Sequence, residues 1–173
     1  AELQRTYARR FTSQAEYRSR VWSYLTRDFF QQLVPASGVV LDLGCGWGEF
    51  INNIRAGQRY GMDLNTESRD HLAPDVTFLH QDCSTRWALE DDTLDVVFTS
   101  NFFEHLPDKA SLRRTLAEAF RCLRRGGRLI AVGPNISTVP GAYWDFWDHY
   151  LPLTDRSLEE GLELVGFSVE RRV

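Results

Sequence analysis

The sequence is poor in cysteine and contains no long apolar run. Its three cysteines, Cys45, Cys83 and Cys122, are odd in number and widely spaced, so they fit neither a disulfide framework nor a zinc-binding motif. No apolar stretch approaches the roughly 20 residues that span a bilayer, and the arginine-rich beginning of the chain lacks the apolar core of a secretion signal. We therefore expect a cytoplasmic protein of a reducing compartment, without a membrane span.

The sequence also lacks an excess of positive charge. Its 20 Lys and Arg residues stand against 24 Asp and Glu residues, for a formal net charge of −4. Nucleic-acid binding through counterion release needs clustered positive charge, so nucleic acid is not an expected partner. The 173 residues, 43% of them hydrophobic, suffice for one core, and we expect a single domain.

Short apolar runs alternate with helical patterns along the chain. The runs that predict buried strands are residues 39–43, 59–62, 76–80, 94–99, 128–132 and 167–169. The segments that predict helices are residues 18–33, 50–54 and 111–125, the last ended by Gly126 and Gly127. The alternation predicts an α/β fold, with a mostly parallel sheet, helices on both faces and ligands at the carboxyl ends of the strands.

A glycine-rich loop follows the first apolar run. Its pattern is Asp42-x-Gly44-x-Gly46-x-Gly48. Glycine lets the backbone turn sharply and approach a ligand without an intervening Cβ. A tight strand-to-helix turn that binds nothing would need the same residue type, so the loop alone leaves both readings open.

Acids at the ends of the next two runs favour a nucleoside ligand. Asp63 can accept from both hydroxyls of a ribose, and Asp82, beside Cys83, can accept from an adenine amino group. A dinucleotide site has the pattern G-x-G-x-x-G and lays pyrophosphate on a helix N-terminus. Here Asp42 precedes the loop, where it would repel pyrophosphate and attract the cationic end of a sulfonium amino acid.

Together these features resemble the class I, Rossmann-like S-adenosylmethionine-dependent methyltransferases. The resemblance covers about residues 39–132, and residues 100–106, 133–135, 143–149 and 152–154 resemble bacterial methyltransferases of glycan or other small-molecule biosynthesis. It implies one methyltransferase domain, with a helical cap at residues 1–37, a cofactor-binding core at 38–135 and an acceptor-side segment at 136–173. The family sheet ends in an antiparallel strand. We expect that strand to be missing from this chain.

The resemblance also assigns contacts to the cofactor, S-adenosylmethionine. The methionine part would lie against the glycine loop, and the adenosyl part against the ends of the second and third runs. The implied contacts are Asp42, Gly44, Cys45, Gly46, Gly48, Ser100 and Asn101 for the methionine part, Asp63 for the ribose, and Leu64, Asp82 and Cys83 for the adenine. Trp47 is larger than the residues of the family at this position, and a lid and a core contact both remain open for it.

Catalysis of methyl transfer rests mainly on alignment of donor and acceptor, so no nucleophilic residue is needed. For a hydroxyl acceptor, His105 is the best-placed base and His149, beside Asp148, is the second candidate. A structural role for His105 stays open. The aromatic stretch 143–150 fits either a pocket wall or the core, and no spacing of histidines and acids supports a metal site.

We expect methyl transfer to a small-molecule or glycan-type acceptor, as O-methylation. The alternatives are a protein or nucleic-acid methyltransferase, and a non-catalytic module that binds S-adenosylmethionine. The fourth run ends without the Asn/Asp-Pro-Pro-aromatic signature of amino-methylating nucleic-acid enzymes, and the complete glycine loop disfavours a non-catalytic module. A homo-oligomer is compatible with the sequence.

Overall fold

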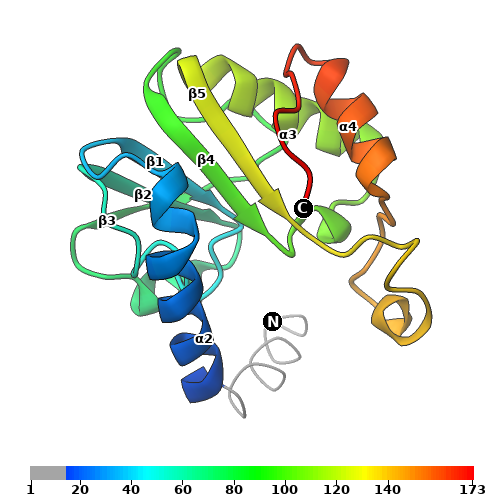
Figure 1. The fold of residues 1–173 in the computed structure, drawn as a ribbon, viewed down its shortest axis with the longest axis horizontal. Helices are drawn as coiled ribbons and strands as arrows, with labels where there is room; N and C mark the ends of the chain where they lie inside the picture. The colour runs from blue at the N-terminus through cyan, green and yellow to red at the C-terminus, as the bar shows by residue number, and fades with distance from the viewer. Residues whose placement is uncertain (1–14) are drawn as a thin grey trace.

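The computed structural model describes residues 15–173 (Figure 1). It contains α-helices, parallel strands and short 3-10 helices. The α-helices are α2 (Ala15–Asp28), α3 (Lys109–Cys122) and α4 (Asp155–Glu163). The strands are β1 (Val39–Leu43), β2 (Gln58–Asp63), β3 (Val76–His80), β4 (Leu94–Ser100) and β5 (Leu123–Val132). The 3-10 helices are η1 (Phe30–Leu33), η2 (Thr66–His71), η3 (Phe103–His105) and η4 (Gly141–Asp145).

The five strands form one parallel sheet in the order β3-β2-β1-β4-β5. The chain builds the sheet outward from β1 in one direction and then returns to place β4 on the other side of β1. The order reverses between β1 and β4, where Leu43 lies opposite Thr99. Parallel sheets bind ligands beyond the carboxyl ends of the strands at such a reversal. The prediction of a parallel sheet is confirmed for the first five of its six expected strands.

The alternation of side chains divides the core into two clusters, one on each face of the sheet. On one face Val40, Val96 and Phe98 pack with Phe30 of η1, and Trp22 of α2 packs against this cluster. On the other face the buried residues of β1 and β4 pack with Leu112 of α3 and its neighbours, while α4 covers the edge of the cluster. Figure 1 shows α2 in front of the sheet, with α3 and α4 on the far side. Helices therefore cover both faces, as predicted.

The third predicted helix ends three residues early. Asp108 caps the start of α3 by accepting a hydrogen bond from the Ser111 amide at 2.7 Å. The helix ends at Cys122 and the chain passes directly into β5, whose register against β4 shifts between Leu94 and Val96. Gly126 adopts φ +80° within this bulge. The two glycines thus serve a strand irregularity, and the prediction that they terminate a helix was wrong.

The connection from β1 to β2 contains turns where residues 50–54 were predicted to form a helix. Single helical hydrogen bonds form, such as that from the Ile54 amide to the Phe50 carbonyl at 3.0 Å. The Asn52 side chain instead binds the neighbouring segment, donating to the His71 carbonyl and accepting from the Ala73 amide. Asparagine side chains that bind backbone groups compete with helix, and Gly57 follows too soon for a second turn.

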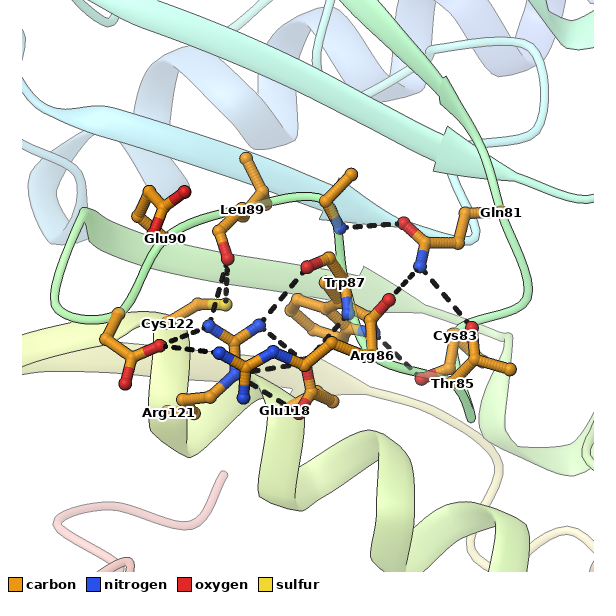
Figure 2. Close-up of polar contacts among 12 residues, drawn as sticks. Gln81, Cys83, Thr85, Arg86, Trp87, Leu89, Glu90, Glu118, Arg121 and Cys122 are labelled. Atoms are coloured by element: carbon orange, nitrogen blue, oxygen red, sulfur yellow. Dashed lines mark hydrogen bonds and ion pairs between the residues drawn. The ribbon is translucent and has the colours of Figure 1, made fainter.

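The segment between β3 and β4 has no helix and is held by α3 instead. The Arg121 guanidinium donates to the Leu89 carbonyl at 2.9 Å and to Asp91 at 2.6 Å, while Glu118 accepts from the Trp87 amide at 2.8 Å. Figure 2 shows Arg121 and Glu118 reaching from α3 to this segment. A partly buried, charge-assisted network on α3 therefore orders the polar backbone of residues 81–93.

The sixth predicted strand, residues 167–169, does not form. The Phe167 amide donates to the Leu162 carbonyl at 3.1 Å, so it closes the end of α4 rather than a strand ladder. Phe167 packs edge-on against Phe120, and Glu170 lies 3.6 Å from Arg128 of β5. The segment therefore lies beside β5 through side chains alone (Figure 1).

Two further expectations bear on the fold. Residues 18–33 were predicted as one helix, and the structure divides them between α2 and η1. The expected cap at residues 1–37 lies partly outside the described residues. Within residues 15–173, no helix is both long enough and apolar enough to span a bilayer.

Candidate functional site

A cavity of about 380 Å³ opens at the carboxyl ends of β1 and β4. It lies where the strand order reverses, the position that the parallel sheet predicts for a ligand. Its walls come from the loop after β1, the segment after β4, helix α2 and residues 143–149. The predicted site residues that line it are Asp42, Gly44, Cys45, Gly46, Ser100, Asn101, His105 and His149.

The glycine loop presents bare backbone to this cavity. Gly44, Gly46 and Gly48 all have positive φ angles, of +71°, +50° and +76°, which other residues rarely adopt. A Cβ on Gly44 would lie 2.3 Å from the ring of Phe102, so no larger residue fits there. The Gly44 and Cys45 amides both donate to the Met62 carbonyl, at 2.9 and 3.1 Å, and so attach the loop to β2.

Asp42 places a buried carboxyl at the base of the loop. The side chain is 3% exposed, and burial, reinforced by the charge of Glu49, raises the pKa of Asp42 well above its usual range. A cationic ligand group beside it would favour the charged form of Asp42. Burial likewise raises the pKa of the Cys45 thiol, which disfavours its thiolate form.

The structure places the predicted adenosyl contacts outside the cavity lining. The carboxylate of Asp63 accepts from the Gly46 amide at 2.9 Å and from the Asn65 amide at 2.8 Å, so it holds the end of the glycine loop. Leu64 is 64% exposed. Gly48 also lies outside the lining.

The pair after β3 points in two directions. Asp82 lies at the surface, where its carboxylate accepts from the Ser84 amide at 2.8 Å. The Cys83 side chain is buried against α3, where the Thr115 hydroxyl donates to its sulfur at 3.4 Å. Burial raises the pKa of Cys83 to about 11. Only backbone atoms of Cys83 therefore remain to bind an adenine edge.

The Trp47 ring stacks on the His71 ring, with the ring centroids 4.5 Å apart, and Trp47 does not line the cavity.

The backbone at the end of β4 adopts a left-handed conformation at the cavity wall. Asn101 has φ +47°, in the left-handed region that few residues other than glycine enter. Its amide donates to the Val132 carbonyl at 2.9 Å, and the Thr99 hydroxyl donates to the Leu43 carbonyl at 2.9 Å. Uncommon backbone conformations persist only where the surrounding structure maintains them, and they are frequent at functional sites.

Two histidines face each other at the far side of the cavity. His105 Nδ1 lies 2.8 Å from the Asp148 carbonyl, and His149 Nδ1 lies 2.6 Å from the Tyr143 carbonyl. Because a carbonyl oxygen only accepts, each Nδ1 carries a proton, and in the neutral form of each ring the lone pair lies on Nε2. The ring centroids are 4.9 Å apart and the rings meet nearly at right angles.

Glu104 holds the segment that carries His149, a role that the sequence analysis missed. Its side chain is 2% exposed and accepts from the Tyr143 hydroxyl at 2.5 Å. Its carbonyl accepts from the Tyr150 and Leu151 amides at 2.8 and 3.0 Å. A signal was present in the sequence, since an acid between Phe103 and Leu106 is buried and needs a partner.

The aromatic stretch forms one wall of the cavity rather than part of the core. Tyr143 and Phe146 line the cavity, and Trp147 is 86% exposed. Arg18 of α2 lies 2.5 Å from Glu49, and both also line the cavity. The sequence analysis did not find Arg18 or Glu49, because only the fold brings α2 next to the glycine loop.

Comparisons with known proteins show the family to which this chain belongs. The family described as "Methyltransferase domain" matches residues 41–131, which is more than half of the chain. An uncharacterized 37.1 kDa protein in transposon TN4556 of Streptomyces fradiae is 33% identical over 116 residues, covering 61% of this chain and 32% of that protein. The chain thus spans about a third of the length of this curated relative.

Two solved structures are similar over most of the chain. A SAM-dependent methyltransferase from Archaeoglobus fulgidus is 25% identical with a TM-score of 0.71, covering 87% of this chain and 69% of that one. A SAM-dependent methyltransferase from Thermotoga maritima, described as a possible histamine N-methyltransferase, is 19% identical with a TM-score of 0.73, covering 95% and 81%. The family match includes the glycine loop and covers the five strands of the sheet almost completely. This chain therefore belongs to the methyltransferase domain family.

Proposed function

We propose that this protein transfers the methyl group of S-adenosylmethionine to a hydroxyl of a small-molecule or glycan-type acceptor. Membership of the methyltransferase domain family implies S-adenosylmethionine as the cofactor. The hydroxyl acceptor is our inference from the histidines of the cavity. Because the chain spans a third of its curated relative, the activity of the whole protein is part of the proposal.

The residues present fit the methionine part of this cofactor. The bare backbone at Gly44 and Gly46 allows close approach, and Asp42 offers a carboxyl to the ammonium or sulfonium group. Arg18, at the cavity wall beside Glu49, supplies positive charge for the carboxylate of the ligand. The cavity therefore provides groups of both signs for a zwitterionic amino acid with an additional positive charge.

The adenosyl part would extend from the cavity along the ends of β2 and β3. In this proposal Asp63 binds the ribose hydroxyls with the lone pairs that its two amide contacts leave available. Leu64, exposed at the surface, would cover one adenine face. Asp82 and the backbone of Cys83 would bind the adenine edge.

The cofactor supplies an activated methyl group, and the protein aligns it with the acceptor. An in-line displacement depends on holding the acceptor oxygen, the methyl carbon and the sulfur collinear. The hydroxyl proton must also leave, and His105 is placed to accept it on Nε2. The observation that carries this assignment is the hydrogen bond from His105 Nδ1 to the Asp148 carbonyl, because it fixes the tautomer while the ring lines the cavity.

A product assay tests the proposal. Mass spectrometry after incubation with S-adenosylmethionine and candidate hydroxyl acceptors should show a product heavier by one methylene, together with S-adenosylhomocysteine. His105→Ala should lower turnover about 100-fold or more, while the affinity for S-adenosylhomocysteine changes little. His80→Ala, which removes an exposed histidine outside the cavity, is the matched control and should leave turnover at saturating S-adenosylmethionine unchanged.

Two results would count against the assignment. Unchanged turnover in His105→Ala would show that the ring accepts no proton. A parallel loss of thermal stability and cofactor affinity would show that His105 is structural. Methylation of nitrogen acceptors alone would contradict the hydroxyl chemistry and leave the family assignment intact.

A further inference from the structure

Three side chains that can bind a metal ion meet at the acceptor side of the cavity. His105 follows β4, whereas Asp148 and His149 belong to the turn after η4. One potential ligand atom from each residue lies within 4.8 Å of the others. His105 lies 43 positions before Asp148, and only the path of the chain across the cavity brings it to the Asp148–His149 pair.

Both imidazoles are held in the way that metal-binding histidines usually are. A histidine that binds a metal normally donates its other ring N–H to a carbonyl or a carboxylate, which orients the ring. His105 Nδ1 donates to the Asp148 carbonyl and His149 Nδ1 donates to the Tyr143 carbonyl. The arrangement leaves the Nε2 lone pairs of two adjacent rings as ligands.

The carboxylate of Asp148 adds negative charge to this pair. Its side chain is 11% exposed and one oxygen lies 3.6 Å from His105 Nδ1. Removing a carboxylate from water is unfavourable, and a nearby cation offsets that cost. Glu104 stabilises the cluster indirectly, because it anchors the Tyr143 hydroxyl and the Tyr150 amide on either side of it.

We propose that His105, Asp148 and His149 form a binding site for a divalent transition-metal cation. Two imidazoles and one carboxylate suit Zn²⁺, Fe²⁺, Mn²⁺ or Co²⁺ better than Mg²⁺ or Ca²⁺, which prefer oxygen ligands. Ligand atoms that are each about 2.1 Å from an ion lie roughly 3 to 3.5 Å apart, so atoms separated by up to 4.8 Å must move closer on binding.

Three protein ligands leave open coordination positions, and both histidines line the cavity. An oxygen of the acceptor is the ligand that could complete the coordination, which would deepen the proposed function. This consequence rests on the proposed function, whereas binding of the ion does not. With an ion bound, His105 Nε2 would be a ligand in place of the base described under the proposed function. The cation would then lower the pKa of the bound hydroxyl, and the hydroxyl proton would pass to solvent.

The test uses the metal-free protein titrated with Co²⁺ and with Zn²⁺. Calorimetry should show one ion per chain, and Co²⁺ should give a visible absorption band of a nitrogen- and oxygen-ligated site. His149→Ala and Asp148→Asn should each weaken binding by about 10- to 100-fold or more. His80→Ala should bind like the parent, and Mg²⁺ should not compete with Co²⁺.

The outcomes separate this proposal from the proposed function. S-adenosylhomocysteine binding serves as the folding control, since the variants leave the glycine loop intact. Weak binding that is equal in the parent, His149→Ala and Asp148→Asn would overturn the metal site, even if methyl transfer were observed. Stoichiometric binding that depends on these residues would support the site, even if no acceptor were methylated.

Discussion

Replacing Gly44 by alanine should disturb the site in two separable ways. The residue has φ +71°, where a Cβ costs about 1 to 2 kcal/mol. The added Cβ would also lie 2.3 Å from the Phe102 ring, and overpacking of this kind costs about 1 to 3 kcal/mol. Gly44→Ala should therefore lower the free energy of unfolding by about 2 to 5 kcal/mol and weaken S-adenosylhomocysteine binding.

Two glycines of the same chain provide matched controls. Gly126 has φ +80° with no atom within 4 Å of an added Cβ, so Gly126→Ala should show only the backbone cost of about 1 to 2 kcal/mol. Gly133 has open space and no such backbone angle, so Gly133→Ala should be nearly neutral. The difference between Gly44→Ala and Gly126→Ala then isolates the contact with Phe102.

Urea unfolding measures these differences, and calorimetry measures ligand binding. In the Phe102→Ala background, Gly44→Ala should lose only the backbone contribution, because the ring that it contacts is gone. If Gly44→Ala resembled Gly126→Ala in stability and bound S-adenosylhomocysteine like the parent, close packing at Gly44 would not shape the loop.

Three further substitutions have defined outcomes. Because burial raises the pKa of Asp42, the free energy of unfolding should fall as pH rises from about 3.8 through the pKa of the folded state. In urea unfolding, Asp42→Asn should remove this decline, and the variant should also bind S-adenosylmethionine more weakly. Asp63→Asn should weaken S-adenosylhomocysteine binding by about 1.5 to 3 kcal/mol in calorimetry, with equal affinity arguing against a ribose contact. Tyr143→Phe leaves the buried Glu104 without its phenol donor and should lower the free energy of unfolding by about 1.5 to 3 kcal/mol; a change below about 0.5 kcal/mol would contradict that role.

The sheet could be predicted from the sequence because its central strands, β1 and β4, are short apolar runs buried on both faces. Residues 39–43 and 76–80 form strands with the predicted bounds. Local patterns failed where tertiary contacts decided the outcome. Gly126 enters a bulge of β5, and the Phe167 amide caps α4, so neither pattern has its usual meaning.

The cavity was predictable only in part, for a related reason. The glycine loop is local in sequence, so its position at the end of β1 followed from the pattern. The approach of Asp148 and His149 to His105 depends on how residues 133–151 cross the cavity, which no periodicity encodes. The contact between Arg18 and Glu49 likewise requires α2 to pack across the sheet.

The central claim is that the cavity at the ends of β1 and β4 binds S-adenosylmethionine. Calorimetric titration of the protein with S-adenosylhomocysteine, and separately with a nicotinamide dinucleotide, tests it most directly. We predict one S-adenosylhomocysteine bound per chain, lost or strongly weakened in Gly44→Ala, and no binding of the dinucleotide. Binding of the dinucleotide without any response to S-adenosylhomocysteine would contradict the account.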